Sequence, residues 1–190
     1  MNHSLLHRWL VLLVFPIALC LATPELRAES QAPVPNPGPE HKRLEILAGT
    51  WAYEGQTSET PLGPKEKFKC KLTSRFILDG FFLETRWEEK NPTGLAQGVE
   101  IHGYDAAAQQ YRTYMFGNDG SQMIGTDTYI GDGIQFEYQM TDAKGRKMLA
   151  KAAATFTPDH RQFTSRWQLS VDGGKTWMPF MEYTGKKIGK

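Results

Sequence analysis

The chain has 190 residues, a formal charge of +1 and 40% apolar residues, which is the composition of an ordinary globular domain. Its 18 glycines, 11 prolines and 12% aromatic residues favour short strands joined by many turns, and they exclude collagen, coiled coil and disorder. With a charge so close to zero and no local cluster of Lys or Arg, we expect no nucleic-acid partner.

Residues 1–28 have the pattern of a secretory signal peptide. Arg8 precedes an apolar run that extends from Trp9 to Ala22. At about 14 residues this run is shorter than the roughly 20 that a transmembrane helix needs. We therefore expect an exported protein, periplasmic or extracellular, with no stable membrane insertion once the signal peptide is removed.

The cleavage site has two candidates. Ala28 is the better placed small residue, and cleavage after Ala22 is the alternative. A lipid anchor on Cys20 is disfavoured because Leu19 stands where a small residue is expected. Export leaves Cys70 as the single cysteine, so the mature chain has no internal disulfide.

Residues 29–40 form a proline-rich linker, with a proline at every second position from Pro33 to Pro39. Residues 41–190 then form one domain. Its first segment, 41–47, has apolar residues on one side and ends before Gly49, which predicts a short helix.

The rest of the domain predicts about ten strands and no further helix, because no run has helical length and period. Turn signals separate consecutive strands, which favours an antiparallel meander, and closure of such a sheet removes both of its edges. The sequence therefore predicts an all-β fold, an antiparallel up-and-down β-barrel with the short helix over one end. The strand-like runs are 51–57, 66–78, 81–90, 95–105, 110–117, 122–130, 133–140, 147–157, 162–171 and 176–187.

One hairpin can be predicted to the residue. Asp79-Gly80 between two strand-like runs is typical of a two-residue type I′ turn. Its register sets one face toward the interior and places two opposite-charge pairs outside, each contributing about 0.2–1 kcal/mol. The inner pairs are Leu78 with Phe81, Phe76 with Leu83 and Leu72 with Trp87, and the outer pairs are Arg75 with Glu84 and Lys71 with Glu88. By the same alternation, Cys70 points inward as an inert buried thiol.

A row of small residues raises the question of an interior cavity. Ala150, Ala152 and Ala154 alternate along one strand and face inward. They either complete a packed interior of large and small side chains or leave room for a guest. For the second reading, the predicted ligand-binding residues are Trp87, Ile101, Tyr138, Ala152 and Trp167.

The sequence has no motif of a catalytic or metal site, so we predict no catalytic residues, no metal and no cofactor. His102 shares a strand with the apolar Val99 and Ile101, and by parity it lies with Glu100 on the opposite face, which predicts that it faces outward. A haem-binding barrel remains an alternative, for which His41, His102 and His160 are the candidate proximal ligands. The segment 170–177 matches the Asp-box pattern of sialidase propellers, in a single copy, and predicts a stiff hairpin.

Several short motifs resemble one bacterial family. The quoted residues are Leu47-x-Gly49-x-Trp51, Leu78-x-Gly80-x-Phe82-Leu83-Glu84, Gly103-Tyr104-Asp105, Gly125 before Tyr129, and Met181-Glu182-Tyr183-Thr184. Over most of residues 41–187 they resemble the domain of unknown function 1579 family. The resemblance implies a lipocalin-like (calycin) barrel with no established activity, in which Lys186 would pack over Trp51.

These observations favour an exported lipocalin-like barrel that binds a small apolar or amphipathic molecule, or serves a structural accessory role, without catalysis. The alternatives are an isomerase- or cyclase-like enzyme acting inside the barrel, and the haem-binding barrel. Convergence of two or more titratable side chains in the cavity would favour the enzyme.

Overall fold

The computed structural model describes residues 36–92 and 94–189. The predicted signal peptide, its cleavage site and the linker up to residue 35 lie outside the described residues. Within the described part of the chain, no helix is both long and apolar enough to span a membrane.

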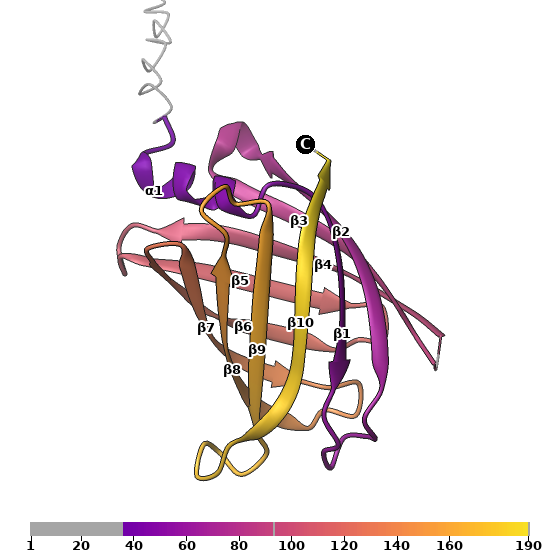
Figure 1. Ribbon diagram of the computed structural model, residues 1–190. Helices are drawn as coiled ribbons and strands as arrows, with labels where there is room; N and C mark the ends of the chain where they lie inside the picture. Colours follow the sequence, from indigo (N-terminus) through magenta and orange to yellow (C-terminus); the bar gives the residue numbers. More distant parts are fainter. Residues whose placement is uncertain (1–35, 93, 190) are drawn as a thin grey trace, which may run out of the picture. The chain divides into compact units, whose positions relative to one another are not determined.

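Ten antiparallel strands follow one another in chain order and close into a barrel where β1 pairs with β10 (Figure 1). The predicted all-β barrel is confirmed, and each predicted run corresponds to one strand. The strands are β1 Gly49–Thr57, β2 Lys67–Ile77, β3 Phe82–Asn91, β4 Gly94–Asp105, β5 Gln110–Gly117, β6 Gln122–Ile130, β7 Gly133–Thr141, β8 Lys147–Phe156, β9 Gln162–Ser170 and β10 Met178–Gly189.

A short helical segment lies across one end of the barrel (Figure 1). It consists of α1 (Pro39–Lys42) and the 3₁₀ helix η1 (Arg43–Ile46), so it begins two residues before the predicted start. A proline suits the first helical turn because its fixed φ matches the helix. Leu44 is fully buried, and the indole nitrogen of Trp51 donates to the carbonyl of Leu47 at 3.0 Å, which fixes the segment to β1.

The opening Trp51 packs against a cation from the last strand. Lys187 is its direct partner on β10, with Nζ 5.0 Å from the indole centroid. The expectation of Lys186 in this role is wrong by one residue, because Lys186 has the opposite parity on β10 and is exposed. The cation–π contact implied by the resemblance is therefore present, and Lys187 provides the cation in place of Lys186.

The register predicted for the β2–β3 hairpin is confirmed, with Phe76 opposite Leu83. Asp79 has φ 56° and ψ 25°, and Gly80 has φ 91°, the angles of a type I′ turn. One residue differs from the prediction: Leu78 is 68% exposed rather than interior. It has φ 49°, so β2 ends at Ile77 and the side chain turns out of the barrel wall.

The two faces of this hairpin are otherwise as predicted. Leu83 and Cys70 are buried, and burial raises the pKa of the Cys70 thiol to about 12. Glu84 lies on the outer face, where Arg75 and Arg86 both bind Oε1, at 3.1 and 2.9 Å. Hydrogen bonds from these two guanidinium groups hold the pKa of Glu84 below its ordinary value.

Aromatic side chains in the barrel interior lie over glycines on the neighbouring strands. In each case the glycine is the direct cross-strand partner, and a Cβ there would overlap the aromatic side chain. A glycine in a strand permits such close approach. The pairs are Trp87 over Gly98, Tyr138 over Gly125, Phe163 over Gly185 and Tyr183 over Gly55.

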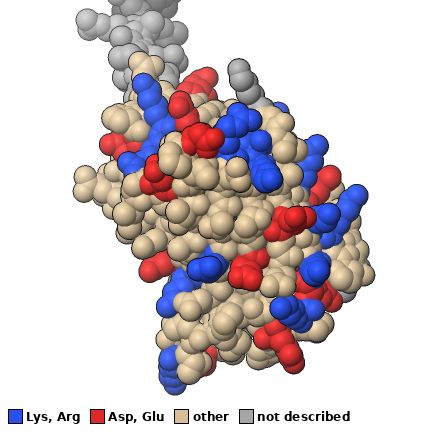
Figure 2. Space-filling view, viewed as in Figure 1, with Lys and Arg blue, Asp and Glu red and all other residues tan. Residues whose placement is uncertain are grey.

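The outer surface in Figure 2 is of mixed charge. Lys and Arg side chains are interspersed with Asp and Glu on this face, with uncharged surface between them. Exposed ion pairs of this kind contribute little stability.

Candidate functional site

The barrel interior encloses a cavity of about 100 Å³. This is room for about three waters at roughly 30 Å³ each, and it is below the roughly 300–1,000 Å³ of typical ligand pockets. The wall combines many aromatic rings with a few polar groups. The aromatic lining residues are Trp51, Tyr53, Phe136, Tyr138, Phe156, Phe163, Trp167 and Tyr183, and the polar ones are Ser74, Thr85, Glu100 and His102.

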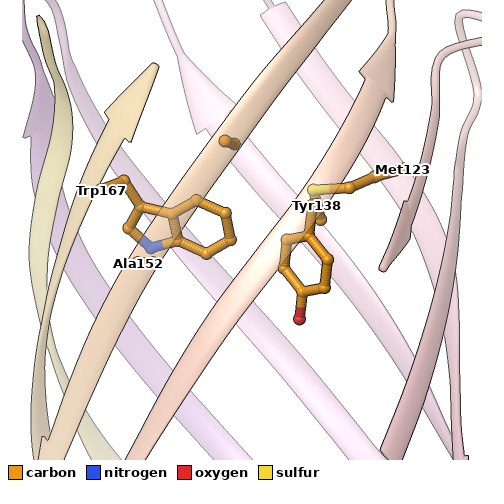
Figure 3. Close-up of a cluster of buried hydrophobic side chains, with 5 residues drawn as sticks. Met123, Tyr138, Ala152 and Trp167 are labelled. Atoms are coloured by element: carbon orange, nitrogen blue, oxygen red, sulfur yellow. The ribbon is translucent and has the colours of Figure 1, made fainter. Parts of the chain in front are cut away.

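The aromatic side stacks across β7 and β9. The rings of Phe136 and Trp167 are 5.9 Å apart and nearly parallel, at 10°. The ring centroids of Tyr138 and Trp167 are 5.8 Å apart. Figure 3 shows these two side chains in one buried cluster with the small Ala152. The indole nitrogen of Trp167 donates to the hydroxyl of Tyr183 at 3.0 Å, which fixes both rings. Most of the interior is therefore packed, and the cavity is the space that these rings leave.

The polar side is a hydrogen-bonded chain across β4, β5, β6 and β7. Tyr138 donates to Oδ1 of Asp127 at 2.7 Å, and Thr113 donates to Oδ2 at 2.6 Å. Nδ1 of His102 lies 2.8 Å from the Thr113 hydroxyl, and Nε2 lies 3.1 Å from Oε2 of Glu100. Because the Thr113 proton points to Asp127, Nδ1 must donate. Oε2 of Glu100 is at ion-pair distance from Nε2, which favours a second proton there and a doubly protonated imidazolium.

The electrostatics agree with that assignment. Burial lowers the pKa of His102, but its contacts with Asp127 and Glu100 raise it more, to about 9. Burial, followed by the charge of Asp127, raises the pKa of Tyr138 well above its ordinary value. At neutral pH the chain thus holds a charged histidine and a neutral phenol.

Glu100 is the more exposed of the two charged residues that line the cavity. Its side chain is 23% exposed, while that of His102 is 6% exposed. Among the described residues, no hydrogen-bond partner binds its Oε1. Its charge adds to burial in raising the pKa of Tyr53 and Cys70, and that of Tyr183, which reaches about 12. These groups come from three other strands, so the charge of Glu100 affects the pKa of interior side chains well beyond its own strand.

The predicted ligand-binding residues divide into three groups. Tyr138 and Trp167 line the cavity. Ala152 is buried beside them without lining it. Trp87 covers Gly98 away from the cavity, and Ile101 lies on the outer face of β4 between Glu84 and Tyr114.

The prediction that His102 faces outward is wrong, because its side chain is buried in the interior with that of Glu100. Val99 and Ile101 face outward instead. One sequence signal could have found this: Trp87 was correctly placed inside, and its cross-strand partner Gly98 has the same parity on β4 as Glu100. Sequence reasoning also missed Asp127, because no motif marks it.

The haem-binding alternative does not fit these histidines. His102 is the one histidine among the described residues lining the cavity, and both of its ring nitrogens are engaged. His160 lies outside, 3.1 Å from Asp132, and Nδ1 of His41 accepts from the backbone of Gly38. Over residues 36–92 and 94–189, no group of three or more His, Cys, Asp or Glu side chains is placed to hold a metal ion.

The Asp-box segment forms the stiff turn between β9 and β10. Asp172 accepts from the backbone and hydroxyl of Thr176, at 3.0 and 2.7 Å, and from Ser170 at 2.8 Å. These bonds lower the pKa of Asp172 to about 2. Gly173 and Gly174 have φ of 75° and 90°, as the turn requires. All three Asp172 contacts stay within the hairpin, which is a structural role.

Solved structures share this fold. Rv2717c from M. tuberculosis superposes with a TM-score of 0.60 at 14% identity, covering 79% of this chain and 98% of that chain. The S-type phycobiliprotein lyase CPES from Guillardia theta gives 0.52 at 9% identity, covering 80% of this chain and 93% of that one. At these identities the similarity shows the barrel fold alone.

No curated protein matches the sequence. A family model does, and it covers residues 36–187, which is most of the described chain. By this match the protein belongs to the family of proteins of unknown function DUF1579.

Proposed function

We propose that the protein binds a small amphipathic molecule in the central cavity of its barrel. The observation that carries this proposal is the composition of the cavity wall, aromatic on one side and polar at Glu100 on the other. Ligand sites commonly combine an apolar lining with a few polar groups that fix orientation. The protein needs no catalytic group for this function.

The cavity volume sets the size of the ligand. An engineered apolar cavity of about 150 Å³ holds benzene, and the cavity here is about 100 Å³. The ligand, or the part of it that enters the barrel, is therefore smaller than benzene or close to it in size. Long-chain fatty acids and retinoids are too large for the interior as packed.

A matched pair of variants tests this site. Ala154 lines the cavity, so Ala154→Leu fills it, whereas Ala153 on the same strand is exposed and Ala153→Leu adds the same atoms outside. Each protein is purified from its native host, and the small molecules released from it are identified by mass spectrometry. We expect a bound molecule from the wild type and from Ala153→Leu, and none from Ala154→Leu. Equal recovery from all three proteins would contradict the proposed site.

We also propose that the protein acts after export. The support is the sequence pattern of residues 1–28. N-terminal sequencing of the protein from its native host should then begin at Glu29. Retention of Met1, or an acylated Cys20, would contradict this.

A second candidate function is acid–base catalysis inside the barrel, as in an isomerase or cyclase. Two titratable side chains, Glu100 and His102, line the same cavity, and Asp127 lies behind them 3.7 Å from His102, which favours it. In this reading Oε1 of Glu100 removes a proton from the bound molecule, and the neighbouring imidazolium stabilises the charge that develops. Incubation of the released ligand with protein in deuterated water would then exchange a carbon-bound hydrogen, and Glu100→Gln would abolish the exchange.

A further inference from the structure

The interior carries more negative than positive charge. Asp127 and Glu100 are the two carboxylates of the cluster, and one imidazolium, His102, lies between them. Its Nδ1 is 3.7 Å from Oδ2 of Asp127, and its Nε2 is 3.1 Å from Oε2 of Glu100. One positive charge against two carboxylates leaves one net negative charge in a poorly solvated interior, which is unfavourable unless a cation compensates it.

The two carboxylates are not equally satisfied. Both oxygens of Asp127 accept hydrogen bonds, from Tyr138 and Thr113, and the side chain has no exposed surface. Glu100 lines the cavity, its Oε2 lies 3.1 Å from Nε2 of His102, and no described residue makes a hydrogen bond to its Oε1. None of the described residues that line the cavity is Lys or Arg. Of the two charged residues in this wall, Glu100 is the one that keeps an oxygen without a hydrogen bond among the described residues.

The aromatic side of the cavity also suits a cation. The faces of aromatic rings attract ammonium and guanidinium groups within about 6 Å, and the attraction is stronger where water is excluded. Trp167, Phe136 and Tyr183 all contribute to the wall. An anion would meet Glu100 and these rings with no positive group free to bind it, since both nitrogens of His102 are engaged.

From this geometry we propose that the ligand of the cavity is a small organic cation, an alkylammonium in the simplest case, whose charged group binds Oε1 of Glu100 and whose apolar body lies against the Trp167 side of the wall. This inference rests on the proposed ligand-binding function and specifies the charge of the ligand. It excludes neutral and anionic molecules of the same shape as the preferred occupants.

Three probes of nearly equal shape test the proposal: tert-butylammonium, tert-butanol and trimethylacetate. Binding is measured on the full chain by NMR, from the methyl signals of Ala154 and Met123, which line the cavity. We expect tert-butylammonium to bind at least about tenfold more tightly than tert-butanol, because a charge-assisted hydrogen bond to Glu100 forms only with the cation. Trimethylacetate should produce no saturable shift.

Glu100→Gln assigns the effect to this carboxylate. It should remove the preference for tert-butylammonium and change the affinity for tert-butanol less than about twofold, because the Gln amide oxygen still accepts a hydrogen bond from the alcohol. Glu137→Gln removes the same charge from the exposed face of β7 and should leave the preference unchanged.

The outcomes separate the two proposals. Equal affinity for the ammonium and the alcohol in the wild type, or tighter binding of trimethylacetate, would overturn the charge assignment and leave small-molecule binding in place. Binding of none of the three probes would overturn the proposed function itself. The wild-type comparison gives a result even if Glu100→Gln fails to fold.

Discussion

Gly125 and Tyr138 are direct partners on β6 and β7, and the ring of Tyr138 occupies the space where a side chain at position 125 would lie. This contact fixes the direction of the phenol, whose hydroxyl donates to Asp127, two residues along β6 from the glycine. The glycine therefore positions one of the donors to the interior cluster.

Gly125→Ala should consequently be destabilising. A Cβ at this position would overlap both the Tyr138 ring and the backbone oxygen of Glu137, and the backbone cannot easily move. Overpacking of this kind costs about 1–3 kcal/mol. Urea unfolding monitored by circular dichroism measures it. Gly63→Ala is the control, because a Cβ there meets nothing within 4 Å, and an equal loss in both variants would contradict the prediction.

Ala152→Phe tests how tightly the aromatic side is packed. Ala152 is buried between its partners Phe136 and Trp167, whose rings already stack on each other, and it does not line the cavity. We expect a loss of about 1–3 kcal/mol in unfolding free energy. Ala153→Phe, on the exposed face of the same strand, should change stability by less than about 0.5 kcal/mol.

If Ala152→Phe proved as stable as the wild type, the interior would have to contain more free volume beside Trp167 than the cavity of about 100 Å³. That result would favour the other interpretation of the alanine row, in which the small residues leave room for a guest. Ligands of retinoid size would then have to be reconsidered.

Much of the fold was predictable because its signals are local. The turn at Asp79-Gly80 fixes a register of paired residues, since positive φ at both positions admits few other structures. Alternation then places Phe76 and Leu83 inside without reference to the rest of the chain. The ten strands follow from turn signals of the same kind.

The polar cluster could not be placed by the same reasoning. On β4 the apolar Val99 and Ile101 face outward, and the polar Glu100 and His102 face the interior. Hydrophobic alternation assigns the apolar pair Val99 and Ile101 to the core. In the structure the polar pair is buried instead, because Thr113 and Asp127 on the next two strands provide a hydrogen-bonded chain for His102. These partners come together only in the assembled barrel, so the sequence of β4 alone does not reveal them.

Replacement of His102 by Leu should be strongly destabilising. It would leave Glu100 and Asp127 as buried carboxylates without the cation between them. Breaking a buried ion pair by removal of one partner costs about 3–5 kcal/mol. Urea unfolding at pH 7 checks this against His160→Leu, a half-buried histidine with an ion pair to Asp132 and an edge contact with Phe156, for which the loss should stay below about 1 kcal/mol.

The stability of the protein should fall as the pH rises from about 6.5 toward 9. Between the ordinary pKa of 6.5 and the folded pKa of about 9, the native His102 holds a proton that the unfolded chain has lost. The native state thus binds more protons, and the free energy of unfolding declines with pH. The stabilising contribution is complete below pH 6.5 and lost above about 9, a total on the order of 3 kcal/mol.

The window between pH 6.5 and about 8 isolates this histidine, because Cys70, the other buried group of moderate pKa, has an ordinary value of 9.0 and adds its own decline only at higher pH. Urea unfolding at several pH values within the window should give a negative slope for the wild type and no slope for His102→Gln, which retains a hydrogen-bonding side chain without the titration. NMR titration of the His102 ring protons should independently locate the folded pKa near 9. A wild-type slope of zero, with the ring titrating near 6.5, would show that the imidazole is neutral at pH 7 and that the charge assignment of the interior cluster is wrong.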